Sequence, residues 1–107
     1  MQAGKLRHVV AIQENQATQN EVGELEHNWV TIATGRASVE PISGREFFEA
    51  QQRQAEITHR VRMRYRTEPV PTMRILYDSR VLMIESVIDV GERRRELHLM
   101  CREMPNG

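Results

Sequence analysis

Short stretches of alternating apolar and polar residues occupy most of this chain. Alternation with a period of two is the pattern of a β-strand that buries one face. We expect six such strands, at residues 6–13, 29–39, 58–66, 73–77, 80–90 and 96–103. The polar stretch between the first two, residues 14–27, predicts a long exposed loop of the kind that often carries function.

The apolar parity of these strands predicts the core, and its interruptions predict the irregularities. The parity changes between Ile84 and Val87, which indicates a bulge, and Gly35 indicates a second bulge or bend. Asp78-Ser79 is suited to a two-residue hairpin turn. The expected inward-facing residues are Leu6, His8, Val10, Ile12, His59, Val61, Met63, Tyr65, Met73, Ile75, Tyr77, Leu82, Ile84, Val87, Leu97, Leu99 and Cys101.

One segment is helical in pattern. Pro41 ends the second strand, and Ser43 and Glu46 form a capping box in which each side chain bonds the other's backbone amide. A helix over about residues 44–54 follows. The chain therefore predicts a mainly β fold, a small, partly open β-barrel of about six antiparallel strands with one inserted α-helix.

Composition narrows the class of protein. A chain of 107 residues is a single domain, with its core at about residues 5–103. The formal net charge is zero, which argues against a dedicated nucleic-acid binder. Lys5 is the only lysine, and all other Lys or Arg positions are arginine. This preference for arginine favours a protein-binding surface or reflects codon usage. No signal peptide and no membrane-spanning stretch is expected, so synthesis in a cytoplasm is predicted.

Groups that carry chemistry are sparse. The four histidines are not spaced with Cys, Asp or Glu as a metal site requires, and no glycine-rich phosphate loop is present. Cys101 lies in an apolar strand and is expected to be a buried, inert thiol. We therefore expect no catalytic residue, no cofactor and no metal, and we do not expect an enzyme.

Four arginines with the same parity on one strand, Arg60, Arg62, Arg64 and Arg66, are the most unusual feature. Like charges on one strand face repel, so something must compensate them. Three interpretations stay open: pairing with the carboxylates of Glu46, Glu49 and Glu56 or plain solvation, an interface with an acidic neighbouring subunit, and contact with DNA phosphates. Contact with DNA is disfavoured, because the arginine row is not accompanied by the interleaved aromatic residues that are usual in such contacts.

The order of motifs resembles the head–tail joining, or head-closure, family of tailed bacteriophages. The resemblance rests on an Arg7-His8 strand, Gly23 in a polar loop, Trp29, and a Pro-Ile-Ser-Gly-Arg-Glu helix entry at residues 41–46. A Thr-His-Arg-Val strand at residues 58–61 and Met73-Arg74-Ile75 follow. Leu82 departs from the family pattern, which often has an aromatic residue there; this concerns packing.

The resemblance implies a structural virion protein at the phage neck. It implies a ring beneath the portal and adaptor that closes the DNA-filled head and provides the tail attachment platform, near packaged DNA and without a membrane. The alternatives are a tail-completion or other neck protein with the same barrel, and a nucleic-acid-binding barrel. Besides the arginine row, the candidate interaction residues are Arg45, Glu49 and Arg53 on the helix, Asn20, Gly23 and Glu24 in the loop, and Pro69 and Pro71 in a stiff turn.

Overall fold

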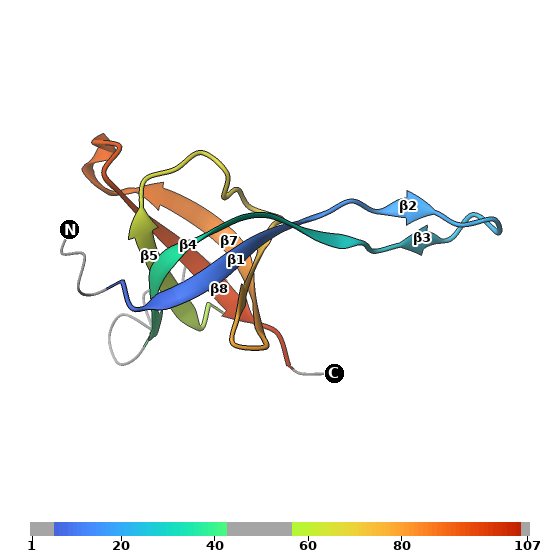
Figure 1. Cartoon of the computed structure of the whole chain (residues 1–107), viewed down its shortest axis with the longest axis horizontal. Helices are drawn as coiled ribbons and strands as arrows, with labels where there is room; N and C mark the ends of the chain where they lie inside the picture. Colours follow the sequence, from blue (N-terminus) through green and yellow to red (C-terminus); the bar gives the residue numbers. More distant parts are fainter. Residues whose placement is uncertain (1–5, 43–56, 106–107) are drawn as a thin grey trace.

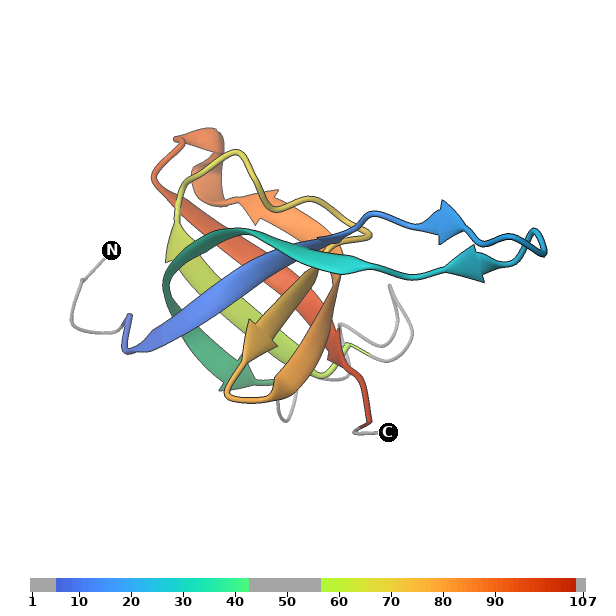
Figure 2. The same ribbon diagram turned by 45° about the vertical axis from the view of Figure 1, so that its right-hand side comes forward.

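The computed structural model describes residues 6–42 and 57–105, and six strands of these residues close into an antiparallel barrel (Figures 1 and 2). The strands lie in the order β1-β4-β5-β8-β7-β6 around the barrel. Their bounds are His8–Asn15 for β1, Trp29–Pro41 for β4, His59–Arg64 for β5, Arg74–Tyr77 for β6, Arg80–Asp89 for β7 and Glu96–Glu103 for β8. The predicted mainly β, antiparallel fold is confirmed.

The barrel is closed, whereas the sequence predicted a partly open one. β1 pairs with β4 along its whole length and also with β6, through Ala11–Leu76, Ile12–Ile75 and Gln13–Arg74. Gln13 is buried and holds this seam, since Arg74 Nε donates to Gln13 Oε1 at 2.7 Å and Gln13 Nε2 donates to Thr31 Oγ1 at 3.0 Å. Closure gives backbone partners to these paired residues of β1 and β6, whose edges would be exposed in an open sheet.

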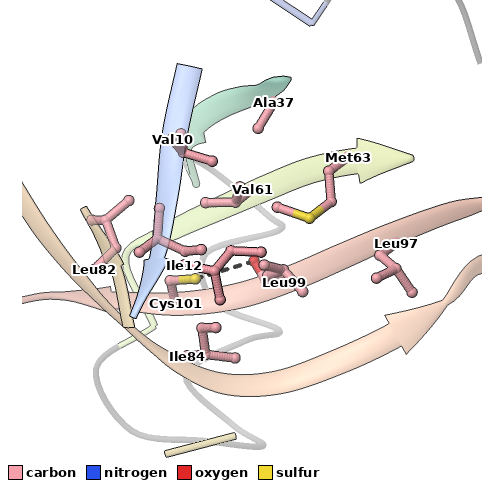
Figure 3. Packing of buried hydrophobic residues seen from close by; sticks show 11 residues of the cluster. Val10, Ile12, Ala37, Val61, Met63, Leu82, Ile84, Leu97, Leu99 and Cys101 are labelled. Carbon is pink, nitrogen blue, oxygen red and sulfur yellow. Dashed lines mark hydrogen bonds between the residues drawn. The ribbon is translucent and has the colours of Figure 1, made fainter. Parts of the chain in front are cut away.

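The interior of the barrel is filled by the predicted apolar parity (Figure 3). Ile12, Val61 and Leu99 come from three different strands and have no exposed surface. The other members of the cluster are Val10, Ala37, Met63, Ile75, Leu82, Ile84, Leu97 and Cys101. Such a core is packed with side chains, so the barrel has no central channel of its own.

One turn and one bulge show where the sequence was informative. Asp78 and Ser79 have φ of 48° and 64° and form the predicted two-residue hairpin turn between β6 and β7. The bulge expected beyond Ile84 is confirmed, since the register of β7 against β8 shifts between Ile84 and Ser86.

Of the bulge or bend predicted at Gly35, the bulge was wrong. Gly35 pairs in register with Val10, and the irregularity lies further along β4, where Ile32 is the extra residue between Ala33 and Thr31. Gly35 has a different role. A Cβ atom there would lie 2.5 Å from Arg66 Nη1, so glycine lets the guanidinium group cross the strand.

The predicted long loop is an ordered two-stranded ribbon, here called the arm (residues 14–28). β2 (Thr18–Gln19) and β3 (Leu25–Glu26) pair antiparallel, and the arm projects far from the barrel (Figure 1). The sequence missed these strands because both faces of the ribbon are exposed and no apolar alternation marks them.

The predicted helix at about residues 44–54 lies outside the described residues. Within residues 6–42 and 57–105, no helix is long and apolar enough to cross a membrane. A short 3-10 turn, η2 (Val90–Glu92), joins β7 to β8.

Candidate interaction surfaces

Arg60 and Arg62, the first two arginines of the row, lie on β5 and face carboxylates of the two neighbouring strands. Arg62 Nη2 lies 3.2 Å from Glu96 Oε1 on β8, and Arg62 Nη1 lies 3.6 Å from Glu40 Oε1 on β4. Arg60 Nε also lies 3.6 Å from Glu40 Oε1. Pairing was one of the interpretations left open, but the partners that the structure describes are cross-strand residues. Glu46, Glu49 and Glu56 lie outside the described residues.

The other end of the row is different in character. Arg66 forms a two-pronged contact with Glu68, through Nε at 2.7 Å and Nη2 at 3.2 Å, and Arg66 Nη1 donates to Thr34 O at 3.0 Å. The hydrogen bond from Arg66 lowers the pKa of Glu68, and the same bond raises the pKa of Arg66. Arg64, which lies between Arg62 and Arg66 in the sequence, is exposed. Only part of the row is therefore available to a partner.

A surface groove of about 560 Å³ adjoins this end of β5. Leu6 and Met63 are buried residues in its lining. Arg36 and Arg64 are exposed at its edge. The complete lining is Leu6, Arg36, Met63, Arg64, Tyr65, Arg66, Thr67 and Glu68. We name this feature the basic groove; its residues come from three distant segments, so sequence reasoning did not find it.

Three consecutive exposed arginines extend the positive charge beside the basic groove. Arg93, Arg94 and Arg95 follow η2 in the turn between β7 and β8. Tyr65 N donates to Arg95 O at 3.0 Å, which ties this turn to the groove. Asp89 Oδ1 accepts from Arg94 N at 3.0 Å and helps hold Arg94 at a positive φ of 54°. The sequence places these arginines next to one another but does not indicate which surface they lie beside.

The predicted residues of the arm have two roles. Asn20 shapes the tip, because its Oδ1 accepts from Val22 N at 3.0 Å and from Glu24 N at 2.9 Å. Gly23 supplies the positive φ of 85° that the tip requires. Glu24 is exposed and offers its carboxylate to solvent. Contact of these residues with a partner stays a prediction.

The remaining candidate interaction residues are those of the proline turn and of the predicted helix. Pro69 is buried, whereas Pro71 and Val70 are exposed, so only the latter part of this turn presents a surface. Met73 N donates to Val70 O at 3.2 Å and closes the turn. Arg45, Glu49 and Arg53 lie outside the described residues.

A polar network lies where β5, β7 and β8 meet, at one end of the barrel. Arg80 binds Glu103 through Nε at 2.9 Å and Nη2 at 2.8 Å, and Arg80 Nη2 lies 3.1 Å from His59 Nε2. Burial lowers the pKa of His59, and the bond from Arg80 lowers the pKa of Glu103. Thr58 Oγ1 accepts from Glu103 N at 2.8 Å. The side chains of this network hold one another in place, so the network has a structural role in joining the strand ends.

Cys101, the single cysteine of the chain, is buried in the core. Burial raises the pKa of the Cys101 thiol, which keeps it protonated and inert. Its Sγ donates to Leu99 O at 3.5 Å inside the core (Figure 3). The described part of the chain contains no cluster of three or more His, Cys, Asp or Glu side chains that suits a metal ion.

Comparison with known proteins now identifies the group to which this barrel belongs. The sequence model of the phage head completion proteins matches residues 1–104. The chain belongs to the phage head completion protein family. Membership makes it a structural protein of the phage virion, in a family that is structural rather than enzymatic. The resemblance found in the sequence is confirmed at this level.

Solved structures agree on the fold. The solution structure of protein SF1141 from Shigella flexneri 2a is 32% identical, covers 100% of both chains and has a TM-score of 0.74. A chain from the virion of a native gene transfer agent particle has a TM-score of 0.63, covers 92% of this chain and 96% of its own, and is 15% identical. The second likeness concerns the fold alone. No curated protein matches the sequence.

Proposed function

We propose that this head completion protein closes the DNA-filled head of a tailed phage as a ring of copies beneath the portal and adaptor, and offers the platform to which the tail attaches. The family match over residues 1–104 carries the proposal. The closed barrel supports it by supplying a rigid body. Because the strands pair with one another all the way around the barrel, we expect copies to associate mainly through side chains and projecting segments.

The arm is the projecting segment best suited to docking on another neck protein. Asn15 braces its base, since Asn15 Oδ1 accepts from Asn28 N at 3.1 Å and Asn15 Nδ2 lies 2.7 Å from His27 Nδ1. Asn20 braces its tip, as described above. An element that is ordered before it binds loses less conformational entropy in binding than a flexible loop does.

The decisive experiment uses phage heads filled with DNA in the absence of this protein. Purified chain is added, and DNA retention and tail attachment are followed separately. Restoration of both is the expected result. Heads that already retain DNA and gain only tail attachment would move the protein to the tail side of the joint, and an effect on neither would refute a role at the neck.

A deletion of residues 17–24 tests the arm within the same assay. Gln16 N already donates to Asn28 O at 2.8 Å, so the deletion leaves residues 25–27 to turn between two paired positions and the barrel should fold. We expect normal thermal unfolding and impaired completion. A matched control replaces residues 17–24 with glycine and serine at constant length. Full completion by both variants would exclude the arm as a docking element.

A further inference from the structure

Among the residues that the structure describes, the charges of this neutral chain are unevenly distributed in space. Residues 14–28 contain four glutamates and no lysine or arginine, so the other residues hold 15 basic against 11 acidic side chains. The acidic part is the arm, which projects from one side of the barrel (Figures 1 and 2). Neutrality is thus the sum of an acidic arm and a basic remainder, and the two attract when they meet on different copies.

The tip of the arm combines this charge with exposed apolar surface. Val22 is 76% exposed and Leu25 is 67% exposed. Glu21, Glu24 and Glu26 are exposed beside them. Aliphatic side chains at the end of an ordered ribbon are suited to an apolar pocket with a basic rim.

The basic groove has those two properties. Leu6, Met63 and Tyr65 supply apolar lining, and Arg36 and Arg64 supply exposed positive charge. Arg66 is already engaged by Glu68 and Thr34, so Arg36 and Arg64 are the arginines that a carboxylate would meet. The groove's cavity of about 560 Å³ is large enough to admit small aliphatic side chains.

We propose that the arm of one copy docks in the basic groove of a second copy, with Val22 and Leu25 in the groove and Glu21, Glu24 and Glu26 facing Arg36 and Arg64. The groove adjoins the C-terminal end of β5. In Figure 1 that end of β5 lies at the left of the barrel, whereas the arm projects to the right. Arm and groove are therefore different surfaces. A contact between different surfaces is head-to-tail, and it generates a ring when the rotation closes. The inference rests on the proposed ring and names its interface.

Charge reversal in the full-length chain tests this pairing. One variant carries Glu21→Lys, Glu24→Lys and Glu26→Lys, and the other carries Arg36→Glu and Arg64→Glu; all five positions are exposed. Self-association is measured by sedimentation velocity at high protein concentration and low salt. The controls keep the charges, as Glu→Asp at the three arm positions and Arg→Lys at the two groove positions. Thermal unfolding verifies that each variant is folded.

The proposal expects the wild type and both controls to associate, and association to weaken as salt rises. Each reversed variant alone should associate at least about tenfold more weakly than the wild type, because like charges meet at the contact. An equimolar mixture of the two should recover association, because each arm then finds a groove of opposite charge. A monomeric wild type, unchanged single variants, or a mixture that stays dissociated would each overturn the interface.

The completion assay separates this inference from the proposed function. Wild-type chain that completes heads without self-associating through the arm leaves the function standing and removes this interface. Charge-dependent association without an effect on heads leaves the interface standing and removes the function. Loss of completion by the reversed arm with unchanged self-association would assign the arm to a different neck protein and overturn the inference.

Discussion

Replacement of Arg62 by glutamine should destabilise the barrel, whereas the same replacement at Arg64 should leave its stability almost unchanged. The two positions share one strand and one parity. The Arg62 side chain is 23% exposed and lies between Glu96, which is 18% exposed, and Glu40, which is 35% exposed. Arg64 is exposed at the edge of the basic groove. The comparison separates structural arginines from those available to a partner.

The expected magnitude follows from the degree of burial. Exposed ion pairs contribute about 0–1 kcal/mol, and removal of one partner from a fully buried pair costs about 3–5 kcal/mol. Arg62 lies between these limits, and its loss leaves Glu40 and Glu96 on the two strands beside it. We expect Arg62→Gln to lower the free energy of unfolding by about 1–2 kcal/mol. Arg64→Gln should change it by less than about 0.5 kcal/mol.

Urea denaturation measures both variants, and a thermal midpoint lowered by about 4–8 °C per kcal/mol gives an independent reading. The double variant Arg62→Gln/Glu96→Gln should regain part of the lost stability, because it removes one of the carboxylates left without a cation. Equal losses at Arg62 and Arg64, or a fully stable Arg62 variant, would refute the view that β5 uses its arginines differently along its length.

Three further results are expected. Leu99→Ala should lower stability by about 2–5 kcal/mol in urea denaturation, since Leu99 has no exposed surface in the barrel core; a loss below about 1 kcal/mol would contradict this packing. Burial lowers the pKa of His59 and His98 below the ordinary 6.5, so the unfolded chain binds protons more readily than the folded one. The free energy of unfolding should therefore be full above about pH 6.5 and decline as the pH falls below it. In a His59→Gln/His98→Gln variant, the free energy of unfolding should depend less steeply on pH. Gly35→Ala should displace the Arg66 guanidinium and cost about 1 kcal/mol, a loss that should largely disappear when Arg66→Met is already present.

The sequence alone determined most of the barrel's strands and its core. β8 was predicted with the bounds that the structure has, and the bulge beyond Ile84 was located correctly. The arginine row was identified, as was the inert Cys101. These features are local, because period-two alternation along one strand states which side chains face inward wherever that strand lies. The ordered set of motifs was also sufficient to indicate the family.

Only the tertiary structure decided the features that depend on which segments meet. Closure requires β1 to pair with β6 more than 60 residues away, through a seam that buried Gln13 holds. The partners of Arg62 come from β4 and β8, and the basic groove combines Leu6, Arg36 and the end of β5. Alternation specifies which side of a strand is buried, but it leaves open which strand lies beside it. Pairing between distant strands is set by the packing of the whole barrel, and that packing brings the groove together and leaves the arm outside it.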